Sequence, residues 1–247
     1  MAIVTTGSDS VRASSTSREG CWQQSVRHAI RDAESLCRRL ELPPKWSRAA
    51  VDAHRDFPLF APLEFVDRIR KRDPWDPLLR QILPIGEEQA QPAGFEIDPL
   101  QECSVTGAPG LLQKYGSRAL LVTTGSCAIH CRYCFRRHYP YAGGPRAIAQ
   151  WQPALDLIKN DAEITEVLLS GGDPLMVVDH QLAQLAAALA AIPHVRRLRI
   201  HTRLPVVIPQ RVTSDLLAWL CGNRLQPVMV IHTNHAREID SHVATAV

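Results

Sequence analysis

Three cysteines that lie close together are the residues best suited to chemistry. Cys127, Cys131 and Cys134 have the spacing C-x3-C-x2-C, so one compact loop can place three sulfurs around an inorganic cluster. A cubane 4Fe–4S cluster has four irons, and three protein thiolates leave one iron without a protein ligand. S-adenosylmethionine (SAM) suits that iron, because its amino and carboxylate groups can chelate a metal. One electron from the cluster can then break a C–S bond of SAM and give a carbon radical.

The same three cysteines could instead hold zinc in a binding module without catalysis. A Cys3His site would add His130 or His138 to the thiolates. Modules of this kind are small, whereas this loop lies in a long α/β segment, and that favours the iron–sulfur cluster. The total of seven cysteines is odd and no secretory signal is recognised, so disulfides are not expected. The other four cysteines are predicted to be ordinary thiols: Cys21, Cys37, Cys103 and Cys221.

Four short apolar runs, separated by segments of helical pattern, must position the cysteines. They predict strands over 119–124, 166–170, 197–202 and 227–233, with helices over 151–159, 179–191 and 214–220. This alternation predicts a parallel sheet, either a (β/α) barrel or an open doubly wound sheet. Each run ends in polar or glycine-rich residues, which predicts one shared site at the carboxyl ends of the strands. These ends are Gly125-Ser126-Cys127, Ser170-Gly171-Gly172-Asp173, His201-Thr202-Arg203 and His232-Thr233-Asn234-His235.

The chain divides into three regions. Residues 1–20 are rich in Ser, Thr and Arg and are predicted to be disordered. Residues 21–110 are predicted to be an irregular helical region punctuated by proline, with helices over 21–42, 45–56, 63–70 and 77–83. Residues 111–247 are predicted to be an incomplete barrel, in which a fourth crossover helix has begun by residues 243–247. A closed barrel would need roughly 80 or more further residues, so we expect the chain to be truncated at its C-terminus.

Composition excludes several classes of protein. The chain has 247 residues, of which 45% are hydrophobic and 21% charged, and this is an ordinary globular balance. No apolar run approaches the roughly 18–20 residues that a membrane span needs, so a cytoplasmic protein without a membrane partner is predicted. The net charge of +3 is too small to indicate nucleic acid, and the arginines are scattered among acids, which disfavours RNA binding.

Longer motifs around the cysteines resemble a known family. They are similar to the lysine 2,3-aminomutase family of the radical SAM superfamily, and most similar to the branch that makes β-lysine for modifying elongation factor P. Segments of the helical region, 65–69, 76–81 and 98–100, also resemble that branch, and the likeness covers roughly residues 57–240. The barrel motifs are Pro109 to Val122, Cys131-Arg-Tyr-Cys-Phe-Arg-Arg-His-Tyr-Pro-Tyr141, Ser170-Gly-Gly-Asp-Pro-Leu-Met176 and Arg199-Ile-His-Thr-Arg-Leu-Pro-Val-Val-Ile-Pro-Gln-Arg211.

The resemblance implies an isomerase that converts lysine to β-lysine. SAM on the open iron gives a 5′-deoxyadenosyl radical, which abstracts a hydrogen from the β-carbon of lysine held as an imine on pyridoxal phosphate (PLP). The amino group then migrates from the α- to the β-carbon. The implied partners are lysine, an electron donor such as flavodoxin or ferredoxin, and elongation factor P with its ligase; a homo-oligomer stays open.

The resemblance also assigns roles to individual residues. Cys127, Cys131 and Cys134 would hold the cluster. The loop Ser170, Gly171, Gly172 and Asp173 would line the methionine end of SAM, unless it is only a tight turn. Arg136 would pair with the substrate carboxylate, unless it is a surface arginine. Lys114, Tyr115 and Arg118 would contact the PLP phosphate, unless they form a solvated helix end. Further residues that could face the cofactors are His201, Arg203, Gln210, His232 and His235.

The chain departs from the family in one respect. A PLP enzyme holds its resting cofactor on a lysine, which this family places near the C-terminus. The lysines here are Lys45, Lys71, Lys114 and Lys159, and the last is expected to face outward from a crossover helix. The anchor is therefore expected to be missing, together with the acidic partners of the substrate ammonium. A catabolic lysine aminomutase and the zinc module remain as alternatives.

Overall fold

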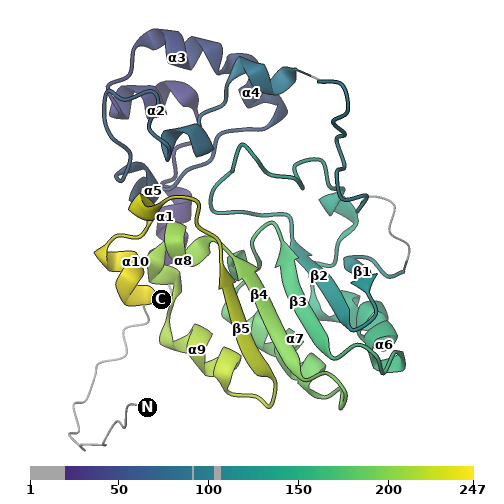
Figure 1. Ribbon diagram of the computed structural model, residues 1–247. Helices are drawn as coiled ribbons and strands as arrows, with labels where there is room; N and C mark the ends of the chain where they lie inside the picture. Colours follow the sequence, from purple (N-terminus) through teal and green to yellow (C-terminus); the bar gives the residue numbers. More distant parts are fainter. Residues whose placement is uncertain (1–19, 91, 103–106) are drawn as a thin grey trace, which may run out of the picture.

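The computed structural model describes residues 20–90, 92–102 and 107–247. The predicted disorder of the N-terminus falls on residues 1–19, outside the described residues, and so does Cys103. In Figure 1 the described chain forms a helical N-terminal region above a sheet whose strands point toward it. The α/β fold-class prediction is confirmed: a mostly parallel sheet with interleaved helices follows a helical region.

The sheet has five strands in the order β1-β2-β3-β4-β5. Strands β2 to β5 are parallel neighbours, and β1 pairs antiparallel with β2. This consecutive order is that of successive βα units in a barrel wall. The strand bounds are β1 Leu111–Tyr115, β2 Arg118–Thr124, β3 Glu166–Gly171, β4 Arg197–Thr202 and β5 Gln226–Ile231.

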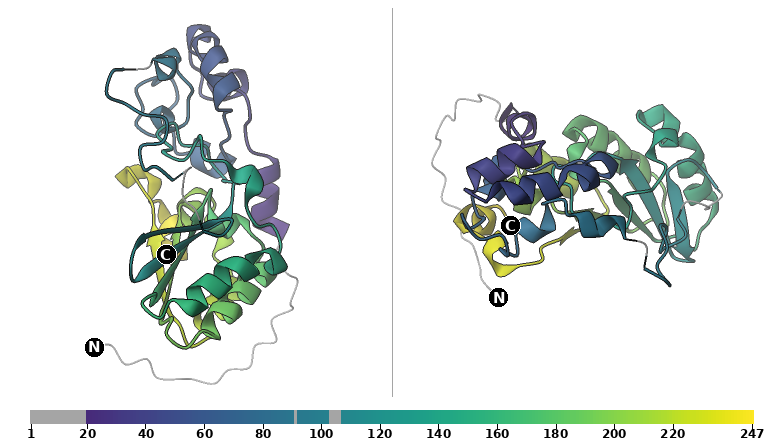
Figure 2. Two further views of the ribbon diagram at one scale, coloured as in Figure 1. Left: turned by 90° about the vertical axis from the view of Figure 1, so that its right-hand side faces the viewer. Right: turned by 90° about the horizontal axis from the view of Figure 1, so that it is seen from above.

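Helices cover one face of the sheet and leave the other face open (Figures 1 and 2). Strand side chains alternate between the faces, so Leu121, Leu169 and Ile200 are fully buried under the crossover helices. The longest of these, α7, is rich in Ala and Leu, which are strong helix formers. The crossover helices are α6 Gln152–Asn160, α7 Asp179–Ala190 and α9 Ser214–Cys221. The other face carries polar side chains, described below.

The sequence predicted the parallel part closely but the helical region less well. The predicted helix over 21–42 is wrong as one element: it is divided into α1 Gly20–Arg27 and α2 Ala33–Arg39. Between them Ile30 bridges Ala61, and the Asp32 side chain caps α2 by accepting from the Ser35 N–H at 2.7 Å. Strand β1 was not predicted, although the two residues between β1 and β2, Gly116-Ser117, suit a hairpin.

The remaining elements are short. In the helical region they are α3 Pro44–Ala49, α4 Val51–Asp56, α5 Leu63–Val66 and the 3-10 turns η1 Leu79–Gln81 and η2 Gly86–Gln89. Around the sheet they are η3 Tyr141–Gly143, η4 Ile148–Trp151, η5 Pro174–Met176, α8 Leu204–Val207, η6 Pro209–Arg211, η7 Ala236–Glu238 and α10 Ser241–Ala246. Among the described residues, no helix has the length and hydrophobicity needed to cross a membrane.

Charged contacts attach the helical region to the carboxyl ends of the strands. Arg237 donates to Asp76 at 2.6 Å, and Arg68 donates to Asp240 at 2.7 Å. Arg68 also donates to the carbonyl oxygen of Val206 in α8. The helical region is therefore fixed above the end of the sheet where the sequence places the site.

Candidate iron–sulfur and cofactor site

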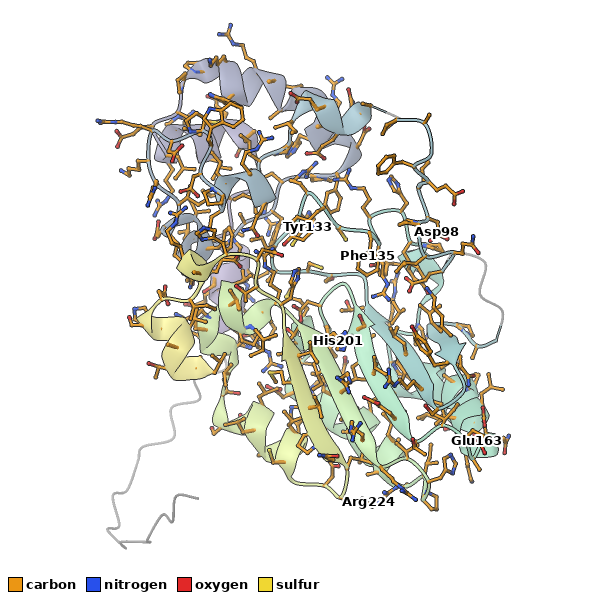
Figure 3. All side chains as sticks on the ribbon, in the orientation of Figure 1. Asp98, Tyr133, Phe135, Glu163, His201 and Arg224 are labelled. Atoms are coloured by element: carbon orange, nitrogen blue, oxygen red, sulfur yellow. The ribbon has the colours of Figure 1, made fainter. Side chains whose placement is uncertain are left out.

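The three clustered cysteines line one cavity with the ends of the parallel strands. This cysteine cavity has a volume of about 640 Å³, within the range of small-molecule sites. The predicted shared site is thus present in the geometry, because loops that follow β2, β3, β4 and β5 all reach it. Figure 3 shows Tyr133 and Phe135 above the strand ends and His201 on β4 below them. Its lining includes Cys127, Cys131, Cys134, Ser170, Gly171, Gly172, Asp173, His201, Thr202, Arg203, His232, Thr233 and Asn234.

The cysteine loop is held from above by the helical region. The backbone N–H of His130 donates to Phe60 O at 2.9 Å, and that of Arg132 donates to Gln81 O at 2.8 Å. The Arg132 guanidinium points away from the cavity and donates to both oxygens of Glu88, at 2.8 and 2.6 Å. These contacts fix the loop between the cysteines without using the thiols.

The arrangement of the thiols fits a cluster better than a single metal ion. Among the described residues, no group of His, Cys, Asp and Glu converges on one ion site. The Nδ1 atom of His130 lies 2.8 Å from the carbonyl oxygen of Pro58, its ring stacks on Phe57, and His138 is exposed. Neither His130 nor His138, the histidines named for the Cys3His alternative, lines the cysteine cavity. In a cubane cluster each thiolate binds a different iron, which lets three thiols share a cavity while standing apart.

Burial raises the pKa of the Cys127 and Cys134 thiols. Neighbouring thiols and the Asp173 carboxylate add to this effect at Cys127. Both are then neutral thiols in the metal-free protein, and coordination requires that they lose their protons. The cavity therefore offers sulfur ligands, and its burial disfavours their thiolate form until a positively charged metal centre binds.

The glycines after β3 allow two loops to touch. Gly172 N–H donates to Thr124 O at 2.6 Å, and Asp173 N–H donates to Ser126 O at 2.8 Å. A Cβ on Gly172 would fall 2.7 Å from the Ser126 carbonyl carbon, and Gly171 has φ +130°, where other residues are strained. These glycines are therefore needed for packing against the start of the cysteine loop.

The Asp173 carboxylate joins two strand ends. It accepts from Leu175 N–H and Thr202 Oγ1 on one oxygen, and from the N–H groups of Arg203 and Leu204 on the other, at 2.7–3.0 Å. Burial raises the pKa of Asp173, although these four donors act against it. With both oxygens occupied, Asp173 shapes the wall of the cavity and fixes β3 against β4.

Arg136 is buried and already paired with a carboxylate. It donates to Glu102 through Nε at 2.6 Å and through Nη2 at 3.0 Å, and its Nη1 donates to the Ser170 hydroxyl at 2.8 Å. A surface role for Arg136 is thus excluded. Glu102 was not found from the sequence, since it lies 34 residues away and only folding brings the pair together.

Lys114, Tyr115 and Arg118 do not form one group. Lys114 points to Leu100 O at 2.8 Å and to Glu102 at 3.3 Å. Arg118 lies 5.8 Å from the Tyr115 ring. They occupy the β1–β2 hairpin, so the alternative of a helix end is wrong. Arg118 begins β2 whereas the cysteines follow its other end, about 20 Å away at 3.3 Å per residue.

The open face of the sheet carries an arginine cluster, defined as Arg118, Arg197 and Arg199 around Glu166. Arg199 Nε lies 2.5 Å from Glu166, and the other two guanidinium groups lie at 3.3 and 3.5 Å. Burial would raise the pKa of Glu166, but Arg199 and its neighbours outweigh it, so the pKa lies below its ordinary value. Three cations share one anion here, which leaves an excess of positive charge.

The other residues singled out from the sequence lie in different places in the structure. His201 and His232 line the cysteine cavity, and the buried Nε2 of His201 has no hydrogen-bond partner among the residues that the structure describes. His235 instead caps η7 by accepting from the Arg237 N–H at 3.1 Å, and Gln210 is exposed on η6. Lys159 is exposed on α6, as expected.

Arg203 lies at the centre of a network that the sequence did not reveal. Its Nη1 donates to Cys131 Sγ at 2.7 Å and to Tyr133 Oη at 2.8 Å. Its Nη2 donates to Glu238 at 2.9 Å and also to Gln81. These partners come from three separate segments, the cysteine loop, η1 and η7, so no local motif could have identified them.

Comparison with known proteins shows which family this chain is similar to. A family model described as a 4Fe-4S single cluster domain matches residues 112–200. An L-lysine 2,3-aminomutase of Haemophilus influenzae is 47% identical over 225 residues, which are 91% of this chain and 67% of that protein. One of Escherichia coli is 44% identical over 231 residues, 93% of this chain and 67% of that protein. One of Clostridium subterminale is 34% identical over 220 residues, 88% of this chain and 52% of that protein.

A three-cysteine loop at the carboxyl ends of a parallel sheet, within a 4Fe–4S cluster domain, defines the radical SAM class. Within this class, the chain belongs to the lysine 2,3-aminomutase family. It spans about two thirds of the length of the Haemophilus and Escherichia relatives and about half of the Clostridium relative.

Proposed function

We propose that the chain holds a 4Fe–4S cluster and SAM and takes part in the isomerisation of lysine to β-lysine. Cys127, Cys131 and Cys134 would hold the cluster, and the cysteine cavity that they line would hold SAM. The observation that carries this proposal is that all three thiols line one cavity with the loops that end β3, β4 and β5. When bound, the cluster supplies the electron that turns SAM into a source of a carbon radical.

The loop after β3 acts on SAM through its shape. Since Gly171 and Gly172 pack against the start of the cysteine loop and Asp173 is saturated by four donors, this loop fixes the cavity wall. Apolar side chains complete the lining and exclude water from the radical: Leu120, Ile129, Leu204 and Val207. SAM therefore meets a rigid surface in which the cysteine loop and the strand ends cannot move apart.

Arg136 binds the substrate carboxylate in place of the Glu102 carboxylate. Its guanidinium is bidentate to Glu102 and presents Nη1 to Ser170 at the edge of the cavity. A lysine carboxylate offers the same planar pair of oxygens as Glu102, and therefore competes for the same donors. Binding requires Glu102 to release part of Arg136, and Lys114, 3.3 Å from Glu102, is placed to keep the freed carboxylate neutralised.

The residues present offer cations for a phosphate dianion but no anchor for PLP, and Arg118 lies about 20 Å from the end of β2 that the cysteines follow, which is farther than PLP reaches. The arginine cluster has a surplus of positive charge on the open face, and Tyr115 lies beside Arg118, so these groups would hold a dianion. None of the four lysines of the chain lines the cysteine cavity. PLP, when bound, supplies the π-system into which the migrating amino group's radical is delocalised.

We propose further that the β-lysine serves elongation factor P. The support is the resemblance of segments 65–69, 76–81 and 98–100 to that branch of the family. A catabolic aminomutase is the second candidate, favoured by the same cavity. Incubation of the reconstituted and reduced protein with SAM, lysine, PLP, elongation factor P and its ligase separates them. A mass increase on elongation factor P supports the first, and free β-lysine without such modification supports the second.

Electron paramagnetic resonance tests the central proposal. The chain is reconstituted with iron and sulfide without oxygen, reduced, and measured with SAM and with S-adenosylhomocysteine, which lacks the sulfonium. A reduced 4Fe–4S spectrum that changes with SAM, together with release of 5′-deoxyadenosine, is expected. Zinc in place of iron, or a cluster spectrum that SAM does not alter, would overturn the proposal.

A further inference from the structure

Arg203 is buried beside the cysteine loop with its terminal nitrogens fully used. Its side chain is 6% exposed, and it stacks on the rings of Phe65 and Tyr133. Its two Nη atoms carry four hydrogens and make four hydrogen bonds, to Cys131, Tyr133, Gln81 and Glu238. One of the four goes to sulfur, at 2.7 Å from Nη1 to Sγ.

The position of this guanidinium is determined from several sides. The backbone N–H of Arg203 donates to Asp173 at 2.8 Å, so the Arg203 backbone is fixed at the point where Asp173 joins the ends of β3 and β4. Glu238, fully buried, accepts from Arg203 and from Gln81 Nε2 at 2.9 Å. Tyr133 Oη accepts from Arg203 at 2.8 Å and from Asn234. Arg203 therefore cannot turn away from Cys131 without leaving buried polar groups unpaired.

A donor fixed on a cluster thiolate changes the energy of reduction. Reduction adds one negative charge to a cluster that already carries thiolates, and hydrogen bonds to the sulfurs and nearby charge set its potential. A guanidinium N–H on Sγ stabilises the reduced state more than the oxidised state. The effect is strong because the site is buried and the charge is fixed in place.

We propose that Arg203 is a positioning residue for the cluster, which orients Cys131 and raises the reduction potential through its hydrogen bond to Sγ. This rests on the proposed function, since it requires that the cysteines hold a 4Fe–4S cluster. Arg136, the other arginine that lines the cavity, bonds Ser170 and Glu102 instead and has no such role.

The test is a redox titration followed by electron paramagnetic resonance on the reconstituted wild type and on Arg203→Lys. Lysine keeps the charge but lacks the planar set of donors needed to bond sulfur and Tyr133 together. At a fixed applied potential the ratio of reduced to oxidised cluster is expected to fall about tenfold in Arg203→Lys, equivalent to about 59 mV for a one-electron couple. Circular dichroism and iron content show whether the variant is folded and loaded.

Arg132→Lys is the matched control. Arg132 is buried next to Cys131 in sequence, but its guanidinium bonds Glu88 and the Phe57 carbonyl, away from the sulfurs. The Arg132→Lys variant is expected to be less stable than the wild type, while its cluster keeps the wild-type reduction potential. An equal potential in wild type and a loaded Arg203→Lys, or equal shifts in both variants, would overturn the inference alone. A wild type that forms no cluster would overturn the proposed function and the inference with it.

A second measurement does not depend on the variants. In wild type labelled with 15N-arginine, pulsed resonance is expected to show a coupling between the cluster and an arginine nitrogen of the strength of a direct N–H···S bond. Absence of that coupling in a loaded protein would overturn the inference, even if neither variant retains a cluster.

Discussion

The two ends of the open sheet face balance their charges differently. At the carboxyl ends of the strands, buried arginines are matched by carboxylates: Arg203 by Glu238 and Arg136 by Glu102. At the amino-terminal ends, Glu166 is the only carboxylate that the described part of the chain pairs with Arg118, Arg197 and Arg199. In the first arrangement each arginine has its own carboxylate, and the second has positive charge left over.

The difference indicates two kinds of site. The cysteine cavity must hold three thiols in fixed positions, and the hydrogen bonds around Arg203, Arg136 and Asp173 give that rigidity before any cofactor arrives. The arginine cluster is half exposed, so water can solvate its surplus charge until an anion replaces it. The first end is expected to respond to mutation through structure and cluster content, and the second through anion affinity.

Removal of a thiol is expected to have the largest effect. Cys131→Ser loses one of three protein ligands, so iron and sulfide bound after reconstitution are expected to fall about tenfold or more. The exposed Cys221 provides the control, because Cys221→Ser changes a cysteine outside the cavity. Iron analysis and the visible charge-transfer absorption check this. Equal iron in Cys131→Ser and Cys221→Ser would show that the cavity is not the cluster site.

Gly172→Ala is expected to disrupt the cavity through packing. Its Cβ would overlap the Ser126 carbonyl and force β3 away from the cysteine loop. The free energy of unfolding is expected to fall by about 3 kcal/mol, in the range of severe overpacking, and cluster content with it. Gly116→Ala is the control, since nothing lies within 4 Å of a Cβ there. Denaturant unfolding of both variants measures the difference, and similar losses would refute the packing argument.

The Glu88 pairs are expected to make the loop sensitive to acid. Burial would raise the pKa of Glu88, but hydrogen bonds from Arg132 and Arg137 outweigh it, so the pKa lies below its ordinary value. The unfolded chain takes up the proton first, near pH 4.3, and the stabilisation, present in full above about pH 5, disappears as pH falls through the folded pKa. Glu88→Gln is expected to lose about 2 kcal/mol at pH 7.

Urea unfolding at several pH values checks that prediction. The gap between wild type and Glu88→Gln should close as the pH falls below 4. A gap that stays constant down to pH 3 would mean that the carboxylate charge is not what stabilises the cysteine loop.

The smallest expected effect concerns the arginine cluster. Glu166→Gln removes its only carboxylate, so inorganic phosphate is expected to bind about tenfold more tightly than to the wild type, or about 1.4 kcal/mol. Thermal unfolding in phosphate and in chloride of equal ionic strength measures this, because screening is then held constant. Glu163→Gln is the control, since Glu163 is exposed outside the cluster. If phosphate protects the wild type and both variants equally, the arginines do not form an anion site.

Local sequence was enough to locate the parallel strands and their crossover helices. The runs over 197–202 and 166–170 fold as β4 and β3 almost to the residue, because the apolar side chains on one face of each strand are buried under the crossover helices. The helix predicted over 21–42 failed because the bridge between Ile30 and Ala61 interrupts it, and that contact lies outside any local window. Short helical segments depend on what they pack against.

The sequence by itself determined the chemistry that is possible here: three thiols at C-x3-C-x2-C spacing, and polar residues at the end of every parallel strand. Tertiary structure alone decided which charges meet. Glu102 reaches Arg136 across 34 residues, and Gln81 reaches Arg203 across 122. A buried charge is stable only where the fold brings a partner to it. The spacing of residues along the chain does not show which partner that will be.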